Sequence, residues 1–99
     1  MSYNELIMKI LDGVKGVDER SYTIATFGLI VEAYKNGRLD DDVLMKTLTE
    51  LCFDVLLAKD TTGDIDQLKV EAAEWAKKFY KAIRLMTVRD RYSGLISRT

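Results

Sequence analysis

Residues 65–86 read IDQLKVEAAEWAKKFYKAIRLM, and this stretch decides the fold class. Its apolar residues recur in steps of three and four, as they do along one face of an α-helix; they are Ile65, Leu68, Ala72, Trp75, Phe79, Ile83 and Met86. The pattern predicts a helix that begins at Asp64 or Ile65 and continues as far as Arg91. Such a helix is roughly 40 Å long at ~1.5 Å per residue. We therefore expect either that its last turns overhang the domain or that it breaks around Thr87-Val88.

The rest of the chain shows the same helical spacing in three shorter segments. No stretch alternates apolar and polar residues for long enough to predict a sheet. The segments run from about Tyr3 to Asp12, from near Asp18 to Asn36-Gly37, and from Asp40 to near Lys59. Glycines after the first two segments are typical of helix ends. The sequence predicts an all-α fold: one domain over residues 1–99, built as a compact four-helix bundle with short loops and a long C-terminal helix.

The inner stripes of the four segments give a predicted core. It contains Leu6, Ile10, Ile24, Phe27, Val31, Leu44, Leu48, Leu51, Val55, Leu68, Ala72, Phe79 and Ile83.

The composition excludes several classes of protein. The chain has 99 residues, of which 47% are hydrophobic and 31% are charged, so it is neither a disordered tail nor a membrane protein. A single cysteine excludes an intrachain disulfide framework. The absence of histidine removes the commonest metal ligand and the commonest general base. The net charge of −1 argues against a uniformly basic nucleic-acid coat.

No set of residues predicts a catalytic, cofactor or metal site. The acids Asp60, Asp64 and Glu71 match some ligand positions of a 12-residue calcium loop, but Ile65 stands where that loop needs glycine. Cys52 lies on the inner face of its helix without an activating base. We therefore expect a non-enzymatic protein without cofactor or metal.

Two of the predicted helices carry more apolar surface than one buried face requires. The predicted helix that begins near Asp18 has a second apolar stripe, which consists of Tyr22, Leu29 and Ala33. The predicted helix that begins at Asp40 has two apolar residues outside its inner stripe, Phe53 and Leu57. Residues 21–34 number 14 and include Glu32, whereas a membrane span needs roughly 20 apolar residues. This additional apolar surface predicts a contact with a partner, and a homodimer is the expected assembly. The first helix or the C-terminal tail of the same chain could also cover it.

Charge is distributed unevenly along the chain. Residues 1–67 carry 7 positive and 13 negative groups, whereas residues 68–99 carry 8 positive and 3 negative groups. This asymmetry gives an alternative function, low-specificity nucleic-acid binding by the last helix. The residues concerned are Lys77, Tyr80, Lys81, Arg84, Arg89 and Arg91. The basic stripe could equally be a solvated face, or it could meet the acidic first half within or between subunits.

Composition also bears on the setting of the protein. The chain has no proline and only three amide side chains, Asn4, Asn36 and Gln67, which is typical of heat-adapted proteins. In size, composition and helix layout it resembles the short orphan proteins of crenarchaeal filamentous viruses of the lipothrixvirus and rudivirus kind. The resemblance implies a host cytoplasm or virion at high temperature, with no enzymatic role. The first apolar cluster stops at Lys9, so no signal peptide is visible and we expect a cytoplasmic chain.

Overall fold

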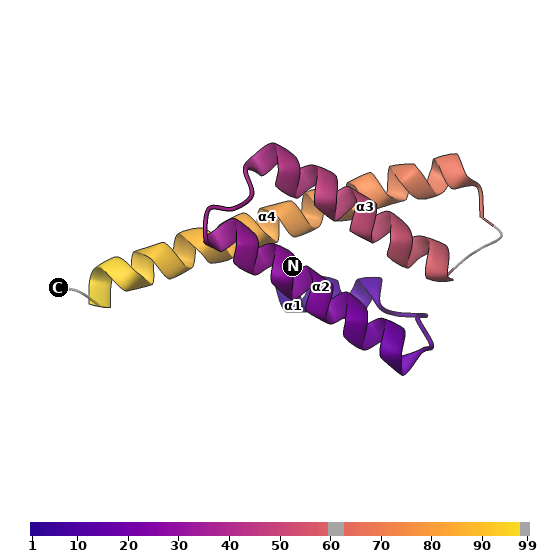
Figure 1. Ribbon diagram of the computed structural model, residues 1–99, viewed down its shortest axis with the longest axis horizontal. Helices are drawn as coiled ribbons and strands as arrows, with labels where there is room; N and C mark the ends of the chain where they lie inside the picture. The colour runs from indigo at the N-terminus through magenta and orange to yellow at the C-terminus, as the bar shows by residue number, and fades with distance from the viewer. Residues whose placement is uncertain (60–62, 98–99) are drawn as a thin grey trace.

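The computed structural model describes residues 1–59 and 63–97, with side chains as far as Val88. The described residues form four helices: α1 (Tyr3–Ile10), α2 (Val17–Lys35), α3 (Asp41–Lys59) and α4 (Ile65–Ser97). They assemble into a helical bundle in which α2 runs antiparallel to α3, and α3 runs antiparallel to α4 (Figure 1). The predicted all-α four-helix fold is confirmed. Asp60, one of the acids considered for calcium, lies outside the described residues.

Local hydrogen bonds explain where three of the helices begin. The Ser2 Oγ accepts from the Glu5 backbone N–H at 3.2 Å at the start of α1. The Asp40 carboxylate accepts from the Val43 N–H at 2.8 Å, so it caps α3. The Asp64 carboxylate accepts from the Asp66 N–H at 3.0 Å where α4 begins. Each cap satisfies a backbone donor that the helix itself leaves unpaired.

The core lies where α1 and α2 meet the α3–α4 pair. The Phe27 and Phe79 rings stack with their centroids 4.6 Å apart, which joins α2 to α4. Tyr3 contacts Phe79 edge-on at 6.0 Å, which joins α1 to the same cluster. The turn after α1 also contributes Leu11 and Val14, both buried.

One core prediction is wrong and another holds only in part. Ile24 is 48% exposed, and its neighbour Thr23 is buried instead. Consecutive helical residues point about 100° apart at 3.6 residues per turn, so one position decides which of the two faces the core. Leu51 packs against the core but is only half-buried. The other predicted core residues are buried.

The long helix α4 is continuous, so of the two expectations for it the overhang is correct. It passes through Thr87 and Val88 without a break. The Thr87 hydroxyl donates to the Ile83 carbonyl at 2.9 Å, so this buried polar group is satisfied inside the helix. The C-terminal end of α4 projects beyond the other helices (Figure 1), and the molecule is 55 Å along its longest axis.

Candidate protein-docking surface

An uncovered apolar stripe runs along α2. Tyr22 and Leu29 are each 72% exposed, and they lie two helical turns apart. Thr26 and Ala33 are partly exposed and complete the spacing i, i+4, i+7 and i+11, which places all four on one side of the helix. We call Tyr22, Thr26, Leu29 and Ala33 the α2 stripe.

The α2 stripe is exposed because α2 packs against the bundle through its other side. Phe27, Ile30 and Val31 are buried there. Neither α1 nor the described part of α4 covers Tyr22 or Leu29. Single exposed apolar residues are ordinary on protein surfaces, but a contiguous row at helical spacing is typical of an interface.

The five residues predicted for self-association do not form one surface. Tyr22, Leu29 and Ala33 share the α2 stripe. Phe53 and Leu57 on α3 are half-buried and pack against the core, so the bundle itself uses much of their apolar surface. Phe53 and Leu57 therefore offer less exposed apolar surface to a partner than Tyr22 and Leu29 do.

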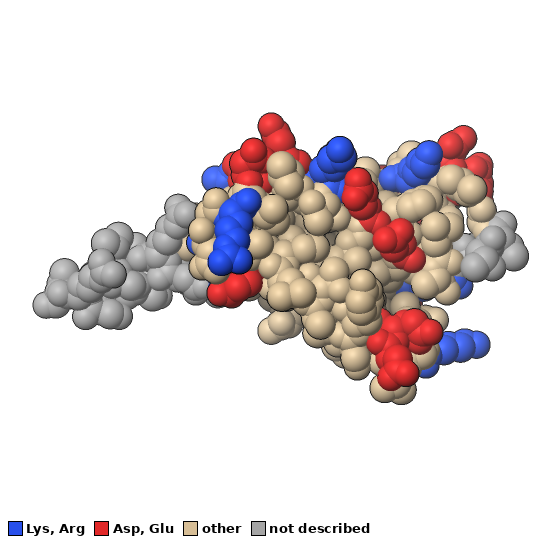
Figure 2. All heavy atoms as spheres, in the orientation of Figure 1, with Lys and Arg blue, Asp and Glu red and all other residues tan. Residues whose placement is uncertain are grey.

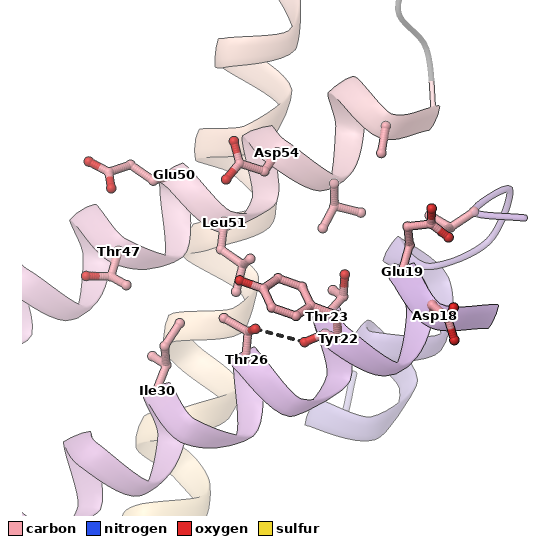
Figure 3. Close-up of a pocket in the computed structure, with 13 residues that line it drawn as sticks. Asp18, Glu19, Tyr22, Thr23, Thr26, Ile30, Thr47, Glu50, Leu51 and Asp54 are labelled. Atoms are coloured by element: carbon pink, nitrogen blue, oxygen red, sulfur yellow. Dashed lines mark hydrogen bonds between the residues drawn. The ribbon is translucent and has the colours of Figure 1, made fainter. Parts of the chain in front are cut away.

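A groove of about 540 Å³ lies between α2 and α3, beside the α2 stripe (Figure 3). Tyr22 and Thr26 belong to both the stripe and the groove, so the two features are continuous. The apolar lining consists of Val14, Ile30, Leu51, Val55 and Ala58. Figure 3 shows the Tyr22 ring and the Leu51 side chain pointing into the space between the two helices.

Acidic side chains stand on both sides of this groove. Asp18 and Glu19 come from the first turn of α2, and Glu50 and Asp54 come from the middle of α3. All four are exposed, and none of the described residues that line the groove is basic. We call these four residues the acidic rim. Like charges around an apolar floor favour a ligand that is both cationic and apolar.

The acidic rim was not predicted from the sequence, although two features of the sequence could have indicated part of it. Glu50 and Asp54 stand four residues apart, so they share one face of α3. Asp18 and Glu19 stand together at a helix start, where acids are ordinarily assigned to the helix dipole. Only the packing of α2 beside α3 brings the two pairs to one groove. Figure 2 shows acidic groups around an uncharged surface on this face of the molecule.

One basic residue of α4, Arg84, takes part in an exposed hydrogen-bonded network that joins three helices. Arg84 Nη1 donates to the Tyr80 hydroxyl at 3.0 Å and to the Asp41 carboxylate at 3.4 Å. The Tyr34 hydroxyl donates to the same carboxylate at 2.6 Å, which raises the pKa of Tyr34. The hydrogen bond that Arg84 donates to the Tyr80 hydroxyl, which is the largest cause, and the charge of Asp41 raise the pKa of Arg84. This network links α2, α3 and α4.

Lys77, Lys81 and Arg84 of the predicted basic stripe are all exposed in the described part of α4, and only Arg84 of the three takes part in the network above. Lys78, beside them, lies with its Nζ 5.2 Å from the centroid of the Trp75 ring. Lys77, Lys81 and Arg84 share one side of α4, whereas Tyr80 is half-buried and hydrogen-bonded to Arg84. The side chains of Arg89 and Arg91 lie outside the described residues.

The described residues present no arrangement typical of a reaction centre. Burial raises the pKa of Cys52 to about 12, so its reactive thiolate is suppressed at neutral pH. No group of three or more acidic, cysteine or histidine side chains in this part of the chain could hold a metal ion. Within the same described residues, no helix has the length and apolar character needed to cross a membrane.

No protein-family model, curated protein or solved structure matches this chain. The α2 stripe, the groove and the outer face of α4 are therefore interpreted from their geometry and charge.

Proposed function

We propose that this protein acts without catalysis, by self-association through the α2 stripe. The observation that carries the proposal is the pair Tyr22 and Leu29, each 72% exposed on one side of α2. Covering such a row removes apolar surface from water, which is the main driving force of protein association. Identical copies are the expected partners, because most soluble oligomers are built from one chain.

The test compares two equivalent substitutions on different helices. Leu29→Glu places a charge in the α2 stripe, whereas Met8→Glu changes an apolar residue of α1 that is 62% exposed. We expect light scattering over micromolar concentrations to show association of the wild type and of Met8→Glu, and a clear loss of association for Leu29→Glu. A wild-type protein that stays monomeric throughout would contradict self-association.

The second candidate function is sequence-tolerant nucleic-acid binding by α4. Exposed Lys77 and Lys81 on a helix that projects from the bundle favour it. Contacts to phosphates would make binding strongly salt-dependent. A fluorescence-anisotropy titration with single- and double-stranded oligonucleotides at two salt concentrations tests this. Binding that is absent at low salt, or that survives Lys77→Glu with Lys81→Glu, rules this candidate out.

We also propose that this protein is adapted to high temperature. This proposal is supported by the few amides, the single cysteine and the absence of proline. We expect a thermal midpoint above the ~45–65 °C that is usual for mesophile domains. Circular dichroism during heating measures it, and a midpoint inside that range would contradict heat adaptation.

A further inference from the structure

We propose that the groove between α2 and α3 receives the basic outer face of α4 from a second copy of this chain. The inference rests on the proposed self-association and names the surface that meets the α2 stripe. Its basis is the match between two exposed surfaces of one molecule, one acidic and one basic.

The receiving surface combines charge with an apolar floor. Glu50 and Asp54 are one helical turn apart on α3, and Asp18 and Glu19 lie in the first turn of α2; all four are among the residues that line the groove (Figure 3). Leu51 and the other apolar lining residues lie between these two acidic pairs. The groove is lined by four exposed carboxylates and by no described basic residue, so a cationic helix laid along it would be attracted.

The outer face of α4 has the complementary pattern. Lys77 and Lys81 are four residues apart, the same spacing as Glu50 and Asp54, so two ion pairs can form in register. Further along the same side, Leu85 and Val88 are 61% and 57% exposed. They offer apolar surface to the floor of the groove. Arg84 has no part in this contact, because Asp41 and Tyr80 already hold it.

The α4 helix of the same chain cannot make this contact. Its buried side, which includes Ala76, Phe79 and Ile83, faces the bundle, whereas Lys77 and Lys81 are exposed. None of the α4 residues whose side chains the structure describes, 65–88, is among those that line the groove. The basic face must therefore come from another molecule. Because the contact joins two different surfaces, it either closes by reciprocal exchange between two copies or extends as a chain of copies.

Charge reversal on each surface tests the pairing. One variant carries Glu50→Lys and Asp54→Lys, and the other carries Lys77→Glu and Lys81→Glu. All four positions are exposed, so we expect both variants to fold, which circular dichroism checks. Each variant alone should associate at least about tenfold more weakly than the wild type, because the α3 side of its groove and its α4 helix then carry like charges.

The equimolar mixture of the two variants gives the decisive result. The reversed groove of one variant meets the reversed helix of the other, and the two unchanged surfaces also remain complementary. We expect light scattering to show that mixing restores association. Lys9→Glu with Lys46→Glu is the matched control for the Lys77→Glu, Lys81→Glu variant: it makes the same change in net charge at exposed positions outside the groove and should associate like the wild type.

The outcomes separate this inference from the proposed function. A wild type that never associates overturns both. Association that survives in each charge-reversed variant, or that mixing fails to restore, overturns the groove–helix contact and leaves self-association in place. Wild-type association should also weaken by about tenfold between low salt and ~0.5 M salt, since exposed charges are screened. Association that is indifferent to salt would overturn the contact without requiring any variant.

Discussion

The rings of Phe27 and Phe79 stack with their centroids 4.6 Å apart and their planes inclined by 25°. Both side chains are fully buried, and they come from α2 and α4, which are separated by the whole of α3 along the chain. This pair therefore attaches α2 to the bundle through the side opposite to its exposed apolar row. The stability of α2, and with it the geometry of the groove, depends on this contact.

Replacing Phe79 with alanine should remove much of that attachment. We expect Phe79→Ala to lower the free energy of unfolding by about 3–5 kcal/mol, because it leaves a cavity and removes the stacked ring. Tyr22→Ala truncates an exposed ring of the α2 stripe, so it should change the free energy of unfolding of the monomer by less than ~0.5 kcal/mol. Urea denaturation at low protein concentration measures both, and equal effects would contradict the assigned core.

Two glycines of the α2 region should respond in opposite directions to alanine. Gly37 follows α2 with φ of 77°, a left-handed conformation that a Cβ disfavours, so Gly37→Ala should cost about 1 kcal/mol. Gly28 lies inside α2, and an added Cβ would meet nothing within 4 Å. Gly28→Ala should stabilise the protein by roughly 0.5–1 kcal/mol through its higher helix propensity. Thermal denaturation of the two variants should show midpoints on either side of the wild type.

Because the thiol of Cys52 is buried, we expect the protein to lose stability at alkaline pH. Burial raises the pKa of Cys52 from its ordinary value of 9.0 to about 12, so the folded state holds the thiol proton more tightly than the unfolded state. Stability from this group is therefore complete below pH 9 and declines as the pH rises toward 12, by up to about 1.4 kcal/mol per pH unit. Denaturant unfolding at several pH values measures the slope. Cys52→Ala should have a shallower slope, and an unchanged slope would contradict the buried thiol.

The tyrosine that faces Asp41 offers a test of the network among α2, α3 and α4. The Tyr34 hydroxyl donates to Asp41 at 2.6 Å, and this bond is the largest cause of the raised pKa of Tyr34. Asp41→Asn removes the negative charge, so the pKa of Tyr34 should move down toward its ordinary value of 10.0. The ring signals of Tyr34 in an NMR titration follow this change. Asp42→Asn in the same first turn is the control and should leave the titration of Tyr34 as in the wild type.

The sequence by itself determined the four helices and most of the core. Apolar spacing places Leu44, Leu48 and Val55 on one face of α3 wherever that helix packs, because the helical period is a local property. Capping is local as well, so Asp40 and Asp64 mark helix starts that the structure confirms. The α2 stripe could be recognised for the same reason, since Tyr22, Leu29 and Ala33 follow one helical spacing.

Only the tertiary structure decided how each helix is turned and which faces stay uncovered. A helix that is apolar on two sides, as α2 is, offers two faces for burial, and packing in the bundle buried Thr23 and left Ile24 exposed. Contacts between distant segments brought Asp18 and Glu19 beside Glu50 and Asp54, and Arg84 beside Asp41. Spacing along one helix carries no information on its neighbours, because packing depends on the shapes of all the helices together. The α2 stripe could therefore be predicted from the sequence, whereas the groove beside it could not, because the groove is formed by the packing of α2 against α3.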